Sequence, residues 1–306
     1  MKRFILSVTV MVLCCSLCGC SLFFIPHKQT AEELKDRWTT TDTTTTTTAP
    51  TSAARPALSP AEVNALRPDY DYGACRRLRG DVAVAVFYMD DFESSWTKEK
   101  ADAFTAEAVE PALKFLEQQA ARHGTELRIR VGQTFVGVPY ADEVISSSAD
   151  AGGYVTSDVL YQAAIGLSYS SQSAMLNDLR QKFGTEEVVC LTVFNKCGGG
   201  YAINPRRGYE NAAQEHSVGF AYDKGVSKNT PFSQQASVTA LYILYLYGAE
   251  DLSNDTGREQ LSKLYYPNDI MMYADYDIRS NGVYGATAFY VGWTDTVPSV
   301  FFNENW

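Results

Sequence analysis

Histidines are scarce in this chain: among its 306 residues there are three, His27, His123 and His216. So few imidazoles give little material for a histidine-rich metal site or for a Ser–His or Cys–His catalytic pair. No G-x-S-x-G segment occurs, and no C-x-x-C pair follows residue 20, so a nucleophile elbow and a cysteine zinc site both lack support. The triplet Gly198–Gly200 shows no phosphate-loop pattern and indicates a flexible surface loop.

Positive charge is also in short supply. The chain has 26 Lys plus Arg against 36 Asp plus Glu, a formal net charge of −10. If a signal peptide is removed, Lys2 and Arg3 go with it and the charge becomes −12. Because an acidic surface repels phosphate backbones, nucleic acid is not an expected partner.

The N-terminus has an apolar run, Phe4–Leu13, that is too short to span a bilayer. It follows the basic residues Lys2 and Arg3, as in a secretory signal. The next segment, Leu17-Cys18-Gly19-Cys20, resembles a bacterial lipobox, although Cys18 is an uncommon residue there. Residues 1–19 are therefore predicted to be a lipoprotein signal peptide, and acyl chains on Cys20 would anchor the protein to the outer face of a bacterial membrane. The alternative is an ordinary secretory signal that contains cysteines.

Three segments are expected after the signal. Residues 20–38 form a short N-terminal segment, and residues 39–60 are rich in Thr and Pro with almost no large apolar side chain. Such a composition cannot bury enough surface to fold, so residues 39–60 are predicted to be a disordered tether. Residues 61–306 have the length and apolar content of a single globular domain.

The thiols beyond residue 20 are odd in number: Cys75, Cys190 and Cys197. Cys190 and Cys197 are seven residues apart, which is too far for a disulfide if the chain between them is extended. A bridge from Cys75 to one of them and three free buried thiols are both compatible with the sequence.

Hydrophobic periodicity predicts alternating strands and helices. Strands are expected at 81–89, 126–138, 186–195 and 217–223, with one wet face at 126–138. A helix at 96–123 is expected to kink at Pro111 and end at Gly124, and a second at 171–183 to end at Gly184. Residues 195–210 indicate a loop, while 150–171 give no clear pattern. Residues 234–247 are apolar on nearly all sides, which predicts a helix within the core.

The apolar helix carries a spacing that resembles the H-E-x-x-H-x-x-G-x-x-D motif of metzincin-type zinc metalloproteases. In that motif two histidines one turn apart bind zinc, the glutamate is the general base, and the last residue is the third ligand. The corresponding residues here are Leu241, Tyr242, Tyr245, Gly248 and Asp251. Downstream, residues 265–275 look like the Met-turn that forms a floor under the metal, with Met271 the leading floor residue and Met272 the other, and residues 285–293 like the helix behind it.

The resemblance implies an α+β, zincin-like fold: a mixed twisted sheet with packed helices, a buried former active-site helix and a Met-turn-like segment. Gly248, Asp251 and Met271 fit the motif, but three of its four chemical positions do not. Leu241 has no lone pair, and phenols at Tyr242 and Tyr245 have an ordinary pKa of about 10. Neither phenol replaces a carboxylate base or an imidazole ligand near neutral pH. We therefore expect no zinc and no other cofactor.

Other candidate sites are weaker. Asp90, Asp91 and Glu93 form an acidic turn that suits either Ca²⁺ or, more commonly, plain solvation. His123 is interpreted as a solvated cation at a helix end, and His216 as a residue that approaches the cleft. The remaining candidates are four tyrosines, whose rings suit either the lining of a binding groove or the core and its rim: Tyr154, Tyr161, Tyr169 and Tyr201.

The leading functional hypothesis is a membrane-anchored extracytoplasmic lipoprotein with a catalytically inactive metalloprotease-like domain. It would bind a peptide or envelope protein or act as an envelope scaffold, through a groove that includes Tyr242, Tyr245, Asp251 and His216. One alternative is an active hydrolase with an unrecognised metal site or nucleophile, for which Cys190 and Cys197 remain open. Another is a purely structural envelope protein.

Overall fold

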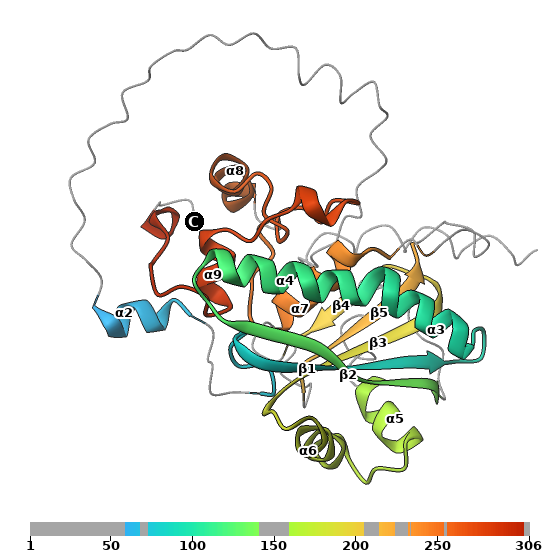
Figure 1. The fold of residues 1–306 in the computed structure, drawn as a ribbon. Helices are drawn as coiled ribbons and strands as arrows, with labels where there is room; N and C mark the ends of the chain where they lie inside the picture. Colours follow the sequence, from blue (N-terminus) through green and yellow to red (C-terminus); the bar gives the residue numbers. More distant parts are fainter. Residues whose placement is uncertain are drawn as a thin grey trace, which may run out of the picture.

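A five-stranded sheet lies at the centre of the molecule (Figure 1). The computed structural model describes residues 59–67, 73–140, 159–204, 214–223, 232, 234–253 and 256–302. The strands are β1 (Gly80–Asp90), β2 (Leu127–Pro139), β3 (Glu187–Cys197), β4 (Tyr201–Ile203) and β5 (His216–Tyr222). Their spatial order is β2-β1-β3-β5-β4; the first four in that order are parallel and β4 runs antiparallel to β5. The expected strands are confirmed.

Burial follows the place of each strand in the sheet. Every residue of β1 from Val82 to Met89 is buried, because β1 lies between two neighbours and both of its faces are covered. β2 is an edge strand with alternating exposed residues near its start, including Arg128 and Arg130, as the one-wet-face pattern predicts. Its register against β1 shifts twice, between Val84 and Ala85 and between Tyr88 and Met89. Charges and bulges of this kind protect an edge strand from pairing with other chains.

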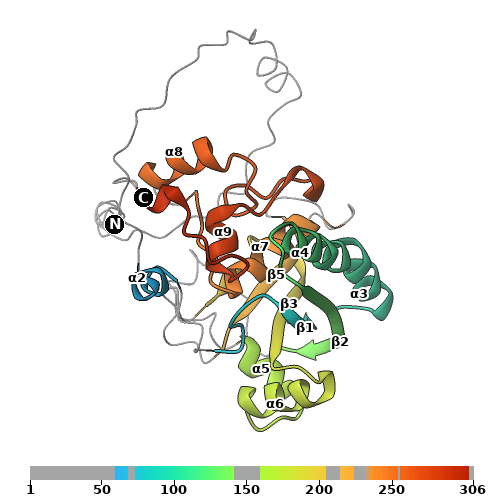
Figure 2. The same ribbon diagram turned by 60° about the vertical axis from the view of Figure 1, so that its left-hand side comes forward.

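Helices cover both faces of the sheet (Figures 1 and 2). One face packs against α4 (Glu110–Arg122) and α7 (Ala236–Leu246), and their shared core contains Val84, Leu116 and Ile243. The other face packs against α5 (Val159–Gly166) and α6 (Gln172–Phe183), with Phe87 and Leu176 in its core. This mixed sheet packed by helices agrees with the expected α+β class.

The long helix expected at 96–123 is interrupted. α3 (Lys98–Phe104) passes into a π-helical segment, η1 (Thr105–Val109), before α4 begins. Pro111 lies in the first turn of α4, where its missing N–H is tolerated. The irregularity thus occurs just before the proline. α4 ends at Arg122, and Gly124, which has φ +72°, lies in the turn that follows. The partly buried His123 side chain contacts the C-terminal region: its Nε2 lies 2.8 Å from the carbonyl oxygen of Val283, and its ring centroid is 5.9 Å from that of Trp293.

The segment 195–210 was expected to be a loop, but much of it belongs to the sheet. β3 continues to Cys197, and residues 201–203 form β4. The glycines between them are closely packed: a Cβ on Gly198 would lie 2.5 Å from the Phe220 ring, and one on Gly200 would lie 2.1 Å from the Tyr242 hydroxyl. Gly198 and Gly200 are therefore tightly packed within the domain, which corrects the flexible-loop interpretation.

The chain enters the domain through a short capped helix and a clamped segment. In α2 (Pro60–Ala65), Ser59 and Glu62 form a capping box, with Ser59 N to Glu62 Oε2 at 2.7 Å. Farther along, the backbone N–H of Ala74 donates to Glu215 and that of Arg76 to Glu187. These two carboxylates fix the entering chain to the start of β5 and β3.

None of the three described cysteines forms a disulfide, so the bridge that the sequence left open is absent. Cys75 and Cys190 are fully buried, and Cys197 is partly buried. Among the described helices, none combines the length and apolar character needed to cross a bilayer.

The C-terminal region contains α8 (Thr256–Tyr265), the 3₁₀ turn η4 (Ile278–Ser280), the short helix α9 (Gly285–Tyr290) and the 3₁₀ turn η5 (Ser299–Phe302). These elements lie beyond α7 and α4, away from α5 and α6 (Figure 2). The helix expected at 285–293 is confirmed, and it ends at Tyr290.

Candidate functional site

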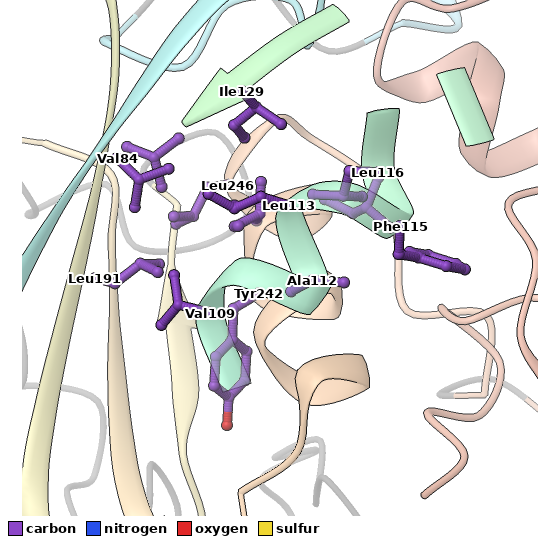
Figure 3. Close-up of a cluster of buried hydrophobic side chains, with 14 of the residues drawn as sticks. Val84, Val109, Ala112, Leu113, Phe115, Leu116, Ile129, Leu191, Tyr242 and Leu246 are labelled. Carbon is purple, nitrogen blue, oxygen red and sulfur yellow. The ribbon is translucent and has the colours of Figure 1, made fainter. Parts of the chain in front are cut away.

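The candidate site is α7 with the turns that follow it. The helix is apolar on most sides because it packs against η1, α4, β4 and β5 at once. Its predicted position within the core is confirmed. Figure 3 shows two of its residues, Tyr242 and Leu246, among side chains of α4 and of strands β1, β2 and β3.

The two positions that correspond to the zinc-binding histidines lie on one face of α7. Leu241 and Tyr245 are four residues apart and, with Val238, form a partly buried stripe that packs at the margin of the core. The spacing thus places both side chains as the motif requires. Their chemistry differs from the motif, since Leu241 offers no donor atom.

Tyr242, at the position of the general base, is a core residue with 4% of its surface exposed. Its hydroxyl reaches Gly200, the residue before β4, which has no side chain to block it. Burial, and then the charge of Asp223, raises the pKa of the Tyr242 phenol above its ordinary value. The hydroxyl therefore stays neutral near pH 7 and cannot accept a proton as a base.

A small internal cavity of about 10 Å³ lies beside Tyr242, enough for about one water molecule. It is lined by residues of η1, α7 and the sheet, among them Val109, Leu191, Thr192 and Ser217. This space is too small for a peptide or sugar, and Tyr242 is a core residue, so it does not line the groove that the sequence predicted.

The end of α7 is capped by the side chain of Asn204, the residue that follows β4. Asn204 Nδ2 donates to the carbonyl oxygens of Tyr245 at 2.9 Å and Leu246 at 3.1 Å. The Tyr245 carbonyl also accepts the N–H of Gly248 at 2.9 Å, so Asn204 adds to the hydrogen bonds that close this helix end. Gly248 follows with φ +94°, so the chain turns sharply there, as the motif predicts.

Asp251, the position of the third ligand, stabilises its own turn. Its Oδ1 accepts from Ser253 N at 2.8 Å and from Ser253 Oγ at 2.6 Å. The next residue, Leu252, donates its N–H to the carbonyl of Met271 at 3.1 Å. The turn after α7 and the Met-turn-like segment are thus neighbours, and Met271 is buried while Met272 is only partly so.

Asp269 organises the Met-turn-like segment, a role that sequence reasoning missed. Its carboxylate is fully buried and accepts from Met271 N at 2.8 Å, Tyr284 N at 2.8 Å and Thr287 Oγ1 at 2.9 Å. Burial raises its pKa to about 6, although the three hydrogen bonds oppose the shift. The available signal was an aspartate two residues before Met271, a spacing that favours an Asx turn.

His216 does not lie with the α7 residues. Alternate β5 residues, Val218 and Phe220, point into the core on the α5 and α6 side, while Ala221 faces α7. Because side chains alternate along a strand, His216 shares the face of Val218, opposite α7. The groove proposed from sequence therefore does not include it.

The remaining candidates have structural roles. Asp91 has a buried carboxylate that pairs with Lys196 at 2.8 Å, whereas the Glu93 side chain of the same turn is 59% exposed. The solvation predicted for this turn therefore holds for Glu93 and not for Asp91. The described residues contain no group of three or more His, Cys, Asp or Glu side chains placed to hold a metal ion. Cys190 is fully buried, and burial raises the pKa of its thiol to about 12, which makes it a poor nucleophile.

The four tyrosines do not form one groove. Tyr201 is buried in β4, Tyr161 is 49% exposed on α5, and the Tyr169 hydroxyl donates to Asp178 beside α6. Tyr154 lies outside the described residues, as do Cys20, His27 and residues 39–58 of the predicted tether. The last two tether residues were assigned wrongly, because Ser59 caps α2 and Pro60 begins it.

Comparison with known proteins adds no family. No protein-family model matches the chain, and no curated protein matches it.

Proposed function

We propose that this protein is a lipid-anchored extracytoplasmic protein whose zincin-like domain has lost its zinc site and acts by binding rather than by hydrolysis. The observation that carries the proposal is the state of Tyr242, a neutral buried phenol where the motif has its general base. A core residue at that position offers neither a proton acceptor nor space for a substrate.

Several features support descent from a zincin. Leu241 and Tyr245 share one face of α7, Gly248 has a positive φ, and Leu252 next to Asp251 contacts the Met271 carbonyl. These are the relative placements that a helix, turn and Met-turn motif requires. Filling the former metal space with Tyr and Leu also avoids unpaired buried polar groups, each of which costs roughly 1–3 kcal/mol.

The anchor completes the proposal. Acylation at Cys20 would fix the protein to the membrane, and the Thr-rich segment 39–60 would extend the domain away from it. No feature of the described residues favours the alternative of an active hydrolase over the binding role.

Zinc content tests the loss of the metal site. We expect the full-length chain, dialysed against metal-free buffer without chelator, to contain far less than one zinc ion per chain by mass spectrometry. About one tightly held zinc per chain, as in a catalytic site, would overturn the proposal.

Restoring the histidines tests the ancestry. The double variant Leu241→His/Tyr245→His changes only partly buried positions and leaves Tyr242 in place. We expect it to bind zinc more tightly than a matched pair on the exposed face of α4, Lys114→His/Gln118→His, because Asp251 adds a third ligand. Equal affinity of the two pairs, or no loss when Asp251→Ala is added, would show that the motif has been aligned wrongly.

Membrane attachment has its own test. The wild-type chain, expressed in bacteria, should partition with the membranes and be released by detergent but not by high salt. Cys20→Ala should move it to the soluble fraction or leave it held by an uncleaved signal of higher mass. A Cys20→Ala chain that is processed and membrane-bound like the wild type would contradict the lipid anchor.

A further inference from the structure

A group of tyrosines is exposed on the C-terminal region of the domain, on elements outside α7. We define the tyrosine patch as Tyr265, Tyr266, Tyr273, Tyr276 and Tyr284. Four of these rings have large exposed fractions: Tyr265 49%, Tyr273 46%, Tyr276 77% and Tyr284 39%. Isolated apolar residues on a surface need no explanation, but several within about twenty residues of sequence do.

The patch has a fixed framework. The ring centroids of Tyr265 and Tyr266 are 6.3 Å apart, and those of Tyr266 and Tyr284 are also 6.3 Å apart and stacked. Asp269 accepts from the backbone of Tyr284, and its own carbonyl accepts from the backbone N–H of Tyr273 at 3.1 Å. Three rings of the patch thus contact one another, and the backbone of Tyr273 is held by Asp269. Tyrosine has only two side-chain torsions to fix, so it loses little conformational entropy when it binds a partner.

Asn281 ties the Tyr273–Tyr276 segment to the rest of the patch. Its side chain donates to the carbonyl of Tyr273 at 2.6 Å and accepts from Asp275 N at 2.9 Å. Tyr276, the most exposed ring, follows Asp275 directly. The segment that carries Tyr273 and Tyr276 is therefore held close to the residues that lead into Tyr284.

The described ion pairs around the patch leave the carboxylate of Asp275 without a cation. Two cations of this segment have described side chains, and both are paired: Lys263 with Glu259 at 2.5 Å and Arg279 with Asp277 at 2.7 Å. Among the residues that the structure describes, no cation forms an ion pair with Asp275, whose Oδ1 accepts the N–H of Asp277. Asn281 holds Asp275 and Tyr273 together through its two hydrogen bonds, and burial, and then the charge of Asp275, raises the pKa of Tyr273.

We propose that the tyrosine patch docks a lysine- or arginine-rich segment of another protein. Tyrosine faces attract cations, and tyrosine is enriched in protein interfaces. The carboxylate of Asp275 and the acidic chain as a whole complement a basic partner and repel anionic polymers. A neutral glycan would also stack on tyrosine rings, but it gains nothing from the unpaired negative charge.

This inference rests on the proposed binding role and names its partner class, yet it does not depend on the ancestry of α7. The test uses the full-length chain and a short fluorescently labelled oligolysine peptide, with binding followed by fluorescence anisotropy. An oligoglutamate peptide and a neutral oligosaccharide serve as the competing ligands. The zinc affinity of the histidine variants tests the ancestry of α7, and its outcome does not depend on whether the tyrosine patch binds oligolysine.

Two sets of variants separate the patch from general charge attraction. Tyr273→Ser/Tyr276→Ser should weaken oligolysine binding at least about fivefold, since each cation–π contact is lost. The matched control Tyr161→Ser removes a ring of similar exposure, 49%, on α5, and should change binding less than about twofold. Asp275→Asn keeps its hydrogen bond to Asp277 and should weaken binding mainly at low salt.

Three results would overturn the proposal. One is equal affinity of the patch variants and Tyr161→Ser for oligolysine, which would mean that the net negative charge of the chain, and not the patch, attracts the peptide. Another is no oligolysine binding at low salt. The third is binding of the neutral oligosaccharide, lost in Tyr273→Ser/Tyr276→Ser, without binding of oligolysine. Unchanged thermal unfolding of the variants verifies that each variant is folded.

Discussion

The sheet and the C-terminal region of this domain are stabilised in different ways. From β1 to β5, backbone groups pair along strands and within helices, and apolar side chains fill both faces of the sheet. From Gly248 onward the regular elements are short, and buried polar side chains connect the turns. Asp269 and Asn281 do there what strand pairing does in the sheet.

The difference teaches how sensitive each region is to substitution. In the sheet region a lost side chain leaves a cavity but few unpaired polar atoms, so the cost scales with apolar volume. In the C-terminal region the Asp269 carboxylate alone satisfies three donors, so a change of charge or geometry at a single residue affects several turns at once.

The largest effect is expected at Phe104, where the aromatic core of the sheet region is densest. Its ring lies 5.2 Å from that of Phe232, 5.7 Å from that of Trp96 and 6.1 Å from that of Tyr88. Phe104→Ala should lower the free energy of unfolding by about 3–5 kcal/mol in urea titrations. Phe92→Ala, at a site 81% exposed, is the control and should change it by less than about 0.5 kcal/mol. A loss at Phe104 as small as that of the control would mean that this core does not carry the fold.

A smaller, pH-dependent effect is expected at Asp269. Its folded pKa of about 6 exceeds the ordinary value of 3.8, so the folded state favours the protonated acid. Preferential protonation of Asp269 in the folded state stabilises that state against unfolding. This stabilisation is complete below the ordinary pKa and is lost as pH rises through about 6, by an amount on the order of 1–3 kcal/mol.

Asp269→Asn does not titrate and removes this dependence. The variant is less stable at any pH because the NH₂ group of the asparagine is a donor and cannot accept a hydrogen bond. Either Tyr284 N–H or Met271 N–H therefore loses its acceptor. The stability gap between wild type and variant should be largest near pH 4 and narrow toward pH 7 in urea titrations. A gap that widens with pH would contradict the direction of the shift.

The smallest of the three effects concerns the turn after α7. Gly248 has φ +94°, which a side chain rarely adopts, so Gly248→Ala should cost about 1–2 kcal/mol. Gly285→Ala is the matched change in α9, where φ is not positive and the new Cβ would be 3.4 Å from the Tyr266 hydroxyl, an ordinary contact. It should cost less than about 0.5 kcal/mol. Equal costs at both glycines would show that the turn conformation is not what Gly248 provides.

Much of the sheet region could be predicted because its signals are local. The apolar run of β1, the alternation in β2, and the glycines at 124 and 184 each follow from spacing along the chain. The apolar helix α7 and the turn at Gly248 were predicted for the same reason. β4 was missed because three residues in a glycine-rich segment carry too little pattern to distinguish a strand from a loop.

At the candidate site, the sequence by itself determined the chemistry that is missing. Leu241 carries no donor whatever its surroundings, and so few histidines restrict any zinc site. The spacing of Leu241 and Tyr245 also fixed their common face, because helical geometry is periodic.

Only the tertiary structure decided which of the candidates meet. It placed His216 on the sheet face opposite α7, buried Tyr242 against Gly200, and paired Asp91 with Lys196. It also brought Asp269 to donors as distant as Thr287, eighteen residues away. Such contacts depend on how elements far apart in sequence pack together, and no local pattern of residue types encodes them.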